Sequence, residues 1–316
     1  MALTDTFREI AIKMSKKQPE MVDQVLEESP IISMIPVQPS SEGTSNVYEE
    51  INSVTGAGLV DLNDELPEVA MDSVLKQIDL SVLGGQMFVP EDKAKALGGA
   101  AAYFASKQPA ILRKTGMDAE QSVLYNNLRA FAIANGGEHK VNAGGSGSTN
   151  FSIIAVKWVP GEVTGLYDPT GFGRGLLMDI QPISGGQLYE KSFTFGDGRT
   201  KKVLGYGIRL KSYFGIQLAN ARYVSTIVNV DLANGKIPTE MQLDDLVTSV
   251  RGQVGGSTWL YMHPRVLSAI QKYKGASLRT EVNVMNINRQ FNAWNDIPIL
   301  TSYNFKNGDE AAVSFA

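Results

Sequence analysis

The segment from residue 44 to residue 90 most constrains the fold, because it has strand patterns but few residues that could form a core. Residues 44–55 and 74–89 both read as strands, and Ile78, Leu80 and Val82 alternate with polar residues, which is the two-residue period of a half-buried strand. Glycines, a proline and five acids fill the stretch between them. We therefore predict a hairpin that projects from the body and gains its order from contacts with other chains.

The composition is that of an ordered protein that can bury a sizeable core. The chain has 316 residues, of which 43% are hydrophobic and 20% charged. No apolar run reaches the roughly 18 residues of a membrane span, and the N-terminus has no continuous apolar block of the kind found in signal peptides. We expect a soluble protein that is made in a cytoplasm and has no membrane partner.

The sequence contains little material for catalysis. There is no cysteine, which excludes disulfides, thiolate metal sites and cysteine nucleophiles. The two histidines, His139 and His263, are far apart in the chain, and His263 precedes a proline that opens a helix, where a cap or packing role is favoured. No G-x-S-x-G motif is present. We predict a protein that is not an enzyme, with no catalytic, cofactor-binding or metal-binding residues.

Two glycine-rich stretches look like phosphate-binding loops if only their glycines are counted. They are "NGGEHKVNAGGSGSTN" at 135–150 and "GFGRGLLMDIQP" at 171–182. A phosphate loop needs a strand before it and a helix after it. The first stretch follows the end of a helix, and in the second Pro182 comes too soon for a helix. A connector and a turn between strands are the favoured interpretations.

The rest of the chain alternates between helical and strand patterns, which predicts an α+β fold. Residues 91–115 are helical in character with interruptions at Gly98-Gly99 and Pro109. The clearest helix runs from a capping-box pair, Asp118 and Gln121, to a glycine stop after Asn135.

Strand patterns dominate from residue 151 to 232, with a long hairpin that turns at Asp197-Gly198 and a sheet that continues to the end of this stretch. Helical patterns return from residue 239, where Thr239 and Gln242 again have capping-box spacing. Pro264 stands at a helix start, and two strands close the chain.

This order of segments, with its strand motifs, resembles the major capsid proteins of tailed bacteriophages that have the Hong Kong 97 type fold, especially a branch found in short-tailed phages. In that branch a strand ending in Val-x-Trp or Val-Trp is followed by Gly, by Gly-Leu/Ile-aromatic and by a Gly-Leu turn with an acid. Later come Gly-Ile/Leu, Arg-aromatic-Val and Asn-Val/Ile-Asp. The matching residues here are Val156, Trp158, Gly161, Gly165, Leu166, Tyr167, Gly175, Leu176, Asp179, Gly215, Ile216, Arg222, Tyr223, Val224, Asn229, Val230 and Asp231.

The resemblance implies a division of the chain and a function. Residues 1–43 would form the N-terminal arm, 44–90 the extended loop (E-loop), 91–235 the peripheral (P) domain with the long spine helix, and 236–316 the axial (A) domain. By this resemblance the chain would be a major capsid protein. It would assemble in the host cytoplasm into pentamers and hexamers that form the icosahedral head of the virion around double-stranded DNA.

The resemblance also implies partners. The chain has no room for a built-in assembly domain of about a hundred residues, so we expect a separate scaffolding protein, together with a portal and a decoration protein. The chain has a net charge of -4 and no dense block of Lys and Arg. The shell should therefore enclose DNA without sequence-specific binding. The alternatives are an encapsulin-type shell of a cellular nanocompartment and, from another class, a nucleotide-binding enzyme that uses the glycine-rich loops.

Two site hypotheses follow. The acids at the tip of the hairpin would repel one another without partners, so we expect them to meet basic residues of an adjacent subunit. The acids are Asp61, Asp64, Glu65 and Glu68, and the candidate bases are Lys107, Arg113 and Lys114. In the connector at 135–150, the glycines would act as a hinge that adapts the subunit to pentamers and hexamers. They are Gly136, Gly144, Gly145 and Gly147.

Overall fold

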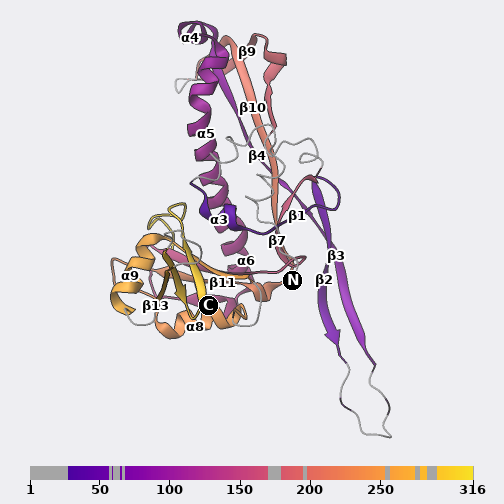
Figure 1. The fold of residues 1–316 in the computed structure, drawn as a ribbon, viewed down its shortest axis with the longest axis vertical. Helices are drawn as coiled ribbons and strands as arrows, with labels where there is room; N and C mark the ends of the chain where they lie inside the picture. The colour runs from indigo at the N-terminus through magenta and orange to yellow at the C-terminus, as the bar shows by residue number, and fades with distance from the viewer. Residues whose placement is uncertain are drawn as a thin grey trace.

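The computed structural model describes residues 28–56, 59, 65, 68–169, 179–194, 198–252, 257–274, 278–282 and 290–315. Figure 1 shows three parts. A tower contains one end of a long helix and several long strands, a lobe carries the C-terminus, and a two-stranded hairpin projects from the body. Helices and strands both contribute to the body, which confirms the predicted α+β class.

The projecting hairpin consists of β2 (Ser45–Thr55) and β3 (Ala70–Asp79), which pair antiparallel. The predicted strand at 74–89 is wrong in one respect, because it divides at Leu80 into β3 and a separate strand, β4 (Ser81–Pro90). Leu80 is buried, and its backbone N–H donates to Thr44 O at 2.8 Å. This anchored residue is where the chain leaves the hairpin and enters the body.

A six-stranded sheet forms the tower. Its central strand is β10 (Thr200–Leu218), which pairs antiparallel with β4, β7, β8 and β9. The bounds of the others are β1 (Val37–Pro39), β7 (Val163–Tyr167), β8 (Asp179–Pro182) and β9 (Tyr189–Thr194). Pairing of β9 with β10 confirms the predicted hairpin, whose turn at Asp197 lies outside the described residues. Only residues 179–182 of the second glycine-rich stretch are described. They form β8, which agrees with the prediction of a turn between strands and not with a helix after a phosphate loop.

A helical rod runs the length of the body. Its segments are α4 (Glu91–Ala96), α5 (Ala100–Ser122), the π-helical segment η1 (Val123–Arg129) and α6 (Ala130–Asn135). The break at Gly98-Gly99 confirms one predicted interruption, whereas the one predicted at Pro109 is wrong, because α5 continues through it. From Ala100 onward the rod is continuous over about 54 Å at the usual rise per residue.

The predicted helix start at Asp118 is wrong, because α5 passes through Pro109, Gly116 and Asp118 without ending. Tertiary contacts override the local signal. Gly116 is buried, and Gln121 does not cap the helix but donates through Nε2 to Asn304 O at 3.2 Å. Asp118 lies 2.5 Å from Lys114 Nζ on the preceding turn.

The lobe is built on a seven-stranded sheet in the order β13-β14-β15-β12-β6-β11-β5. The bounds are β5 (Lys140–Asn142), β6 (Phe151–Trp158), β11 (Val224–Val230), β12 (Ser257–Met262), β13 (Leu278–Val282), β14 (Gln290–Trp294) and β15 (Ile297–Thr301). The prediction of one sheet continuing to residue 232 is wrong. The short helix η4 (Ala221–Tyr223) separates β10 from β11, and the two strands belong to different sheets.

The sheets also run across the expected boundary at residue 235. Strands β5, β6 and β11 precede that boundary, whereas β12 to β15 follow it, and all of them share one sheet. Every side chain of β6 is buried. The lobe therefore forms only when segments from both sides of residue 235 come together.

Helices cover both faces of the seven-stranded sheet. On one face lie α8 (Glu240–Ser249) and α9 (Pro264–Lys274). On the other face lie the last turns of the rod and α3 (Pro30–Met34). A third core cluster, in the tower, joins α4 and α5 to β4 and β10. No helix in the described ranges has the length and apolar character needed to cross a membrane.

Local helix signals in the lobe are confirmed. Thr239 and Gln242 form a complete capping box at the start of α8. Pro264 opens α9, and His263 acts as the predicted cap, since its Nδ1 accepts from the Arg265 backbone N–H at 3.0 Å. Burial lowers the pKa of His263, which favours the neutral ring that can accept this bond.

Candidate assembly surfaces and the tail junction

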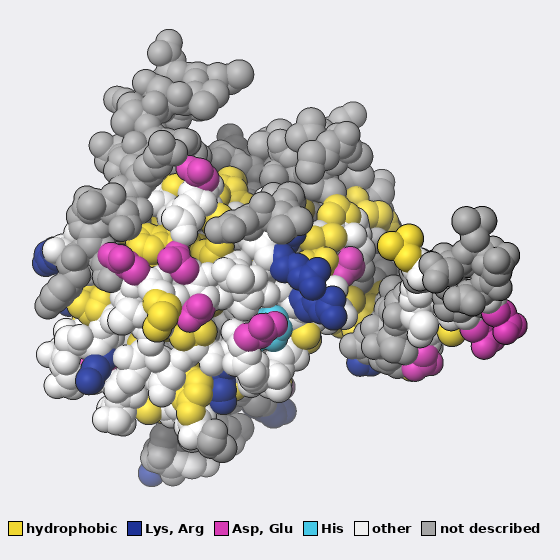
Figure 2. All heavy atoms as spheres, turned by 90° about the horizontal axis from the view of Figure 1, so that it is seen from below, with side chains coloured by type: hydrophobic (Ala, Val, Ile, Leu, Met, Phe, Trp, Pro, Cys, Tyr) yellow, Lys and Arg dark blue, Asp and Glu magenta, His cyan; other side chains and the backbone are white. Residues whose placement is uncertain are grey.

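Apolar side chains of the hairpin are exposed in the subunit. No side chain of β3 is buried, and Met71 is 56% and Leu75 74% exposed. At the tip, Glu65 and Glu68 are exposed, whereas Asp61 and Asp64 lie outside the described residues. Figure 2 looks at the molecule from below and shows apolar and acidic side chains together on the hairpin, at the right. Exposed apolar surfaces of this kind usually mark sites of interaction with other molecules.

The root of the hairpin is held firmly to the body. Asn46 Nδ2 donates to Gln217 Oε1 at 2.7 Å, and both side chains are buried. Gln217 in turn donates to Gly161 O at 2.5 Å. Buried polar side chains that are satisfied in this way fix the local geometry, so the hairpin has a defined direction where it leaves the body.

The candidate bases lie on α5, away from the hairpin tip. Lys107 and Lys114 are exposed and Arg113 is half-buried. Lys114 already pairs with Asp118 of its own helix. Within the described part of the chain, no ion pair joins Glu65 or Glu68 to any of these bases, and the contact between the two groups stays a prediction.

The connector at 135–150 contains more structure than its composition suggests. Gly136 (φ 63°) ends α6, and β5 pairs parallel with β11. A Cβ on Gly145 would lie 2.6 Å from both Asn229 O and Asn150 Oδ1, so only glycine fits there. Gly144 (φ 91°) and Gly147 lie beside it in the bend that leads to β6. The hinge role of these glycines stays a prediction.

His139, in the same connector, is not poised for chemistry. Its Nδ1 lies 2.8 Å from Ser225 Oγ in the interior. Burial is the main cause that lowers its pKa, which favours the neutral ring. The ring packs and shares a hydrogen bond, and the described residues contain no cluster of three or more ligand side chains that could hold a metal ion.

The strand motifs identified in the sequence have clear structural roles. Trp158 Nε1 donates to Tyr261 OH at 2.8 Å inside the core. Gly165 lies against the arm strand β1, where a Cβ would be 2.6 Å from Val37 Cγ1. Asn229 has a positive φ of 61°, a conformation that Asn tolerates better than most residues.

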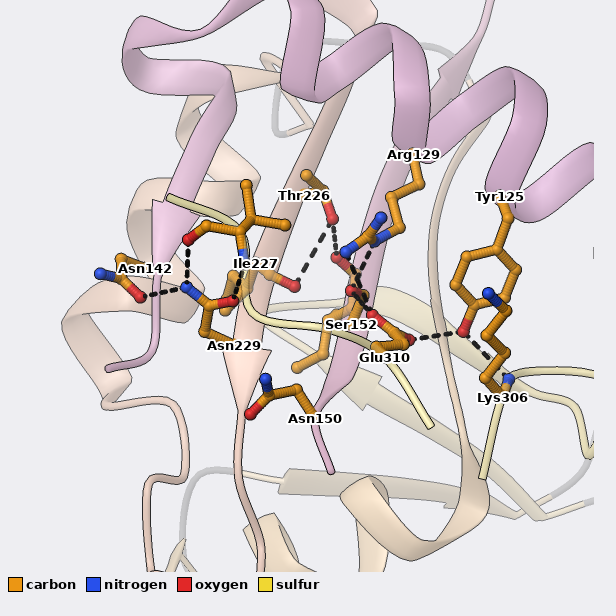
Figure 3. A network of polar contacts seen from close by, with 12 residues as sticks. Tyr125, Arg129, Asn142, Asn150, Ser152, Thr226, Ile227, Asn229, Lys306 and Glu310 are labelled. Carbon is orange, nitrogen blue, oxygen red and sulfur yellow. Dashed lines mark hydrogen bonds and ion pairs between the residues drawn. The ribbon is translucent and has the colours of Figure 1, made fainter. Parts of the chain in front are cut away.

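Asn229 also fastens the C-terminal tail, residues 302–315. Its Oδ1 accepts from the Val313 N–H at 2.7 Å, and its Nδ2 donates to Val313 O at 2.9 Å. The side-chain amide thus pairs with Val313 as a neighbouring strand would. A further bond from Asn229 Nδ2 to Asn142 Oδ1 at 3.0 Å connects the tail to the connector (Figure 3).

A buried carboxylate joins this tail to the helical rod of α5, η1 and α6, which is called the spine from here on. Glu310 accepts from Tyr125 OH and from Ser152 Oγ, each at 2.5 Å, and lies 3.3 Å from Arg129 Nη2 (Figure 3). Arg129 Nε also donates to Ser152 Oγ at 2.9 Å. Burial raises the pKa of Glu310, and the bonds from Ser152 and Tyr125 and the charge of Arg129 oppose that rise.

A second buried carboxylate, Glu120 on α5, joins three segments. It accepts from the backbone N–H groups of Ile31 at 2.8 Å and Ile32 at 3.1 Å, at the start of α3. It also accepts from Ser302 Oγ and, at 2.9 Å, from Asn304 Nδ2. Burial raises the pKa of Glu120 although these bonds lower it. Both carboxylates are held by hydrogen bonds from other segments of the fold.

Sequence reasoning missed both carboxylates. For Glu120 a signal exists, since it belongs to a series of buried positions at intervals of four residues on the spine, Gly116, Glu120, Leu124 and Leu128. An acid within an apolar series indicates a buried partner. For Glu310 there is none, because its partners are more than 150 residues away. The second of the two closing strands predicted from the sequence is also wrong, since residues 311–315 form no strand.

Comparison with known proteins places these features in a family. The model of the major capsid protein GP7 family matches residues 115–314, which include the spine from Thr115 onward, the lobe and the fastened tail. The chain matches no curated protein sequence.

Among solved structures, a chain in the structure of bacteriophage Epsilon15 has a TM-score of 0.56 at 16% identity, over 88% of each chain. The capsid of bacteriophage JBD30 has a TM-score of 0.47 at 13% identity, over 85% of this chain and 88% of that one. An encapsulin complex from Synechococcus elongatus PCC 7942 has a TM-score of 0.39 at 10% identity, over 65% and 88%.

The likeness to the Epsilon15 structure shows the fold, which is the Hong Kong 97 type expected from the sequence. The family match decides between the shell alternatives, because it names a phage capsid family and not a nanocompartment or an enzyme. The chain belongs to the major capsid protein GP7 family and is a structural shell protein of a phage virion.

Proposed function

We propose that this capsid protein forms pentamers and hexamers of a closed icosahedral shell, in which the β2–β3 hairpin of each subunit lies over a neighbour. The observation that carries the proposal is the burial pattern of β3, which has no buried side chain along its ten residues. An isolated two-stranded hairpin is at best marginally stable in water. A neighbouring subunit supplies the missing cover.

The proposal assigns the parts of the subunit by their sheets. The tower, with the six-stranded sheet and α5, acts as the peripheral domain, and the lobe with the seven-stranded sheet acts as the axial domain around the capsomer centre. The hairpin is the E-loop, preceded by the arm. This division rests on sheet membership, which assigns β5, β6 and β11 to the axial domain together with residues 236–316.

At the hairpin tip, the acids Asp61, Asp64, Glu65 and Glu68 meet bases on α5 of an adjacent subunit. Lys107 suits this role best, because it is exposed and makes no ion pair within the described ranges of its own chain. Arg113 and Lys114 are the further candidates. Lys114 already forms an ion pair with Asp118 of its own helix and would have to bind the acid of the neighbour in addition. Exposed pairs are each worth only about 0 to 1 kcal/mol, but a shell repeats them at every subunit.

The partners belong to the same proposal. A separate scaffolding protein, a portal and a decoration protein would act on the shell, and the shell would enclose DNA through its volume and not through sequence-specific contacts. Clustered Lys and Arg would be needed for a wall that grips phosphates, and the net charge of -4 argues against such a wall. Expression with and without candidate scaffold genes, followed by negative-stain imaging, tests the first partner.

A charge swap tests the contact at the hairpin tip. Glu65→Lys should lower the yield of closed particles, and adding Lys107→Glu should restore part of it, because the new pair has reversed signs. Asp245→Lys, an exposed acid on α8 of the lobe, is the matched control and should leave the yield unchanged. Equal yields for Glu65→Lys and the wild type would contradict the contact, and no rescue would exclude Lys107 as the partner.

A further inference from the structure

The spine helix changes its winding where the C-terminal tail meets it. The seven residues from Val123 to Arg129 are π-helical, between the α-helical segments α5 and α6. π-helices are rare and occur mostly as single turns at functional sites. A π segment of this length therefore calls for contacts outside the helix that stabilise it.

The π segment keeps one buried face directed at the sheet. Glu120, Leu124, Leu128 and Ala132 are all buried and are spaced by four residues. In an α-helix each step of four residues moves a side chain about 40° around the axis, so this series would drift away from the sheet. A π turn holds more residues, so within it a step of four turns the series the other way and reduces that drift.

The tail supplies the contacts outside the helix. Tyr125 and Arg129, both within the π segment, converge on Glu310 (Figure 3). Glu310 is only 3% exposed. A buried carboxylate that loses its cation is strongly destabilised. Glu310 and the π segment therefore stabilise each other, since the winding determines where the Arg129 guanidinium and the Tyr125 hydroxyl lie.

The tail is held in place independently of the spine. Asn229 pairs with both backbone groups of Val313, and the backbones of Asn150 and Glu310 form a β-bridge. Lys140 Nζ donates to Ser314 O at 3.3 Å and lies 4.4 Å from the centre of the Phe315 ring. These contacts hold the tail in place, and Glu310 is thereby positioned against the spine.

We propose that the C-terminal tail is a strap that selects the π-helical winding of Val123–Arg129, with Glu310 as its positioning residue. The winding sets the rotation of α6, and so the direction in which the spine passes the chain to the connector and the sheet. This inference does not depend on the contact proposed for the hairpin, and it can be tested on the subunit alone.

The first test compares two neighbouring acids, Glu310→Gln and Asp309→Asn, by hydrogen exchange of the full-length protein. Asp309 is exposed and serves as the matched control. In Glu310→Gln, the amides of 123–135 should lose at least about tenfold in protection, while those of β12 change less than about twofold. Unchanged protection of 123–135, or an equal loss across the whole lobe, would overturn the proposal, since an equal loss means that Glu310 only adds general stability.

The second test reads the winding itself. Because the sequence has no cysteine, Ala110→Cys and Ala134→Cys introduce a unique pair for spin labels on exposed positions of α5 and α6. In an unbroken α-helix these positions would be about 36 Å apart. Glu310→Gln should shift the measured distance distribution, and Asp309→Asn should leave it in place. Superimposed distributions for all three proteins would refute the strap.

A milder variant covers the case in which Glu310→Gln does not fold. Asn229→Asp keeps an oxygen that accepts from the Val313 N–H but removes the donor to Val313 O. It loosens the tail without touching the spine, so a smaller shift in the same direction is expected. An unchanged distribution in a folded Asn229→Asp variant would count against the strap.

Discussion

Two β-ribbons of this subunit have the same local pairing and opposite surroundings. In both β2–β3 and β4–β10, ten pairs of residues face each other antiparallel. The second ribbon packs against α4 and α5 through Met87, Val89 and Leu210. The first has no buried side chain on β3. Antiparallel pairing is common to both, so what distinguishes them is whether the described part of the subunit covers the apolar side chains or leaves them exposed.

The largest expected difference in stability is between two leucine-to-alanine variants, one in the buried core and one on the exposed hairpin. Leu128→Ala, in the fully buried core between the spine and the sheet, should lower the free energy of unfolding by about 2 to 5 kcal/mol. Leu75→Ala, on the exposed hairpin, should change it by less than about 0.5 kcal/mol.

Denaturant unfolding of unassembled subunits measures both variants, and particle yield measures assembly. Leu75→Ala should reduce assembly although it leaves the subunit stable. If Leu75→Ala destabilised the isolated subunit as much as Leu128→Ala, the hairpin would be covered by its own chain and the comparison would fail.

The connector at 135–150 is partly packed and partly open. Its glycines distinguish the two parts, because Gly145 is closely packed and Gly147 is not. Gly145→Ala places a Cβ within 2.6 Å of backbone and side-chain oxygens and should cost about 1 to 3 kcal/mol of stability. Gly147→Ala meets only ordinary contacts, at 3.7 Å and beyond, so the stability should stay within about 0.5 kcal/mol. Thermal unfolding of the two variants checks this difference.

The same pair tests the hinge. Since Gly147→Ala stiffens the connector without a clash, a hinge at this point predicts fewer closed particles or a narrower range of particle sizes. An unchanged size distribution in electron micrographs would remove Gly147 from the hinge.

The smallest effect concerns pH and the buried Glu120. Burial raises its pKa above the usual 4.5, so the folded state binds the proton more tightly than the unfolded state. The stability that this group contributes is fully present below pH 4.5 and is lost as the pH rises through its folded pKa. Glu120→Gln should flatten this part of the pH dependence. Urea unfolding between about pH 4.5 and 7.5 checks it, and identical slopes for the two proteins would contradict the prediction.

The features that sequence analysis predicted correctly are local ones. The capping box of Thr239 and Gln242 is formed within one helical turn, and the hairpin of β2 and β3 follows from alternation and from an acidic, glycine-containing connection. The buried strand β6 is a continuous apolar run flanked by polar loops. In each case the residues that determine the structure are close together in the chain, so a pattern in the sequence reports them.

The features that it missed depend on distant contacts. The capping-box spacing at Asp118 and Gln121 resembles the one at Thr239 and Gln242, but Glu120 is bound by the arm and the tail and the helix continues. Strands β10 and β11 look continuous in sequence, yet they pair in different sheets. Glu310 lies more than 150 residues from Ser152, and no local pattern reports such a pair.

Hydrogen exchange of the hairpin, in free subunits and in assembled particles, tests the central claim that its order comes from neighbouring copies. The amides of β3 should exchange rapidly in the free subunit and become at least about tenfold better protected in particles. Those of β6, buried within the subunit, should be protected in both states. Equal protection of β3 before and after assembly, whether high or low, would contradict the account.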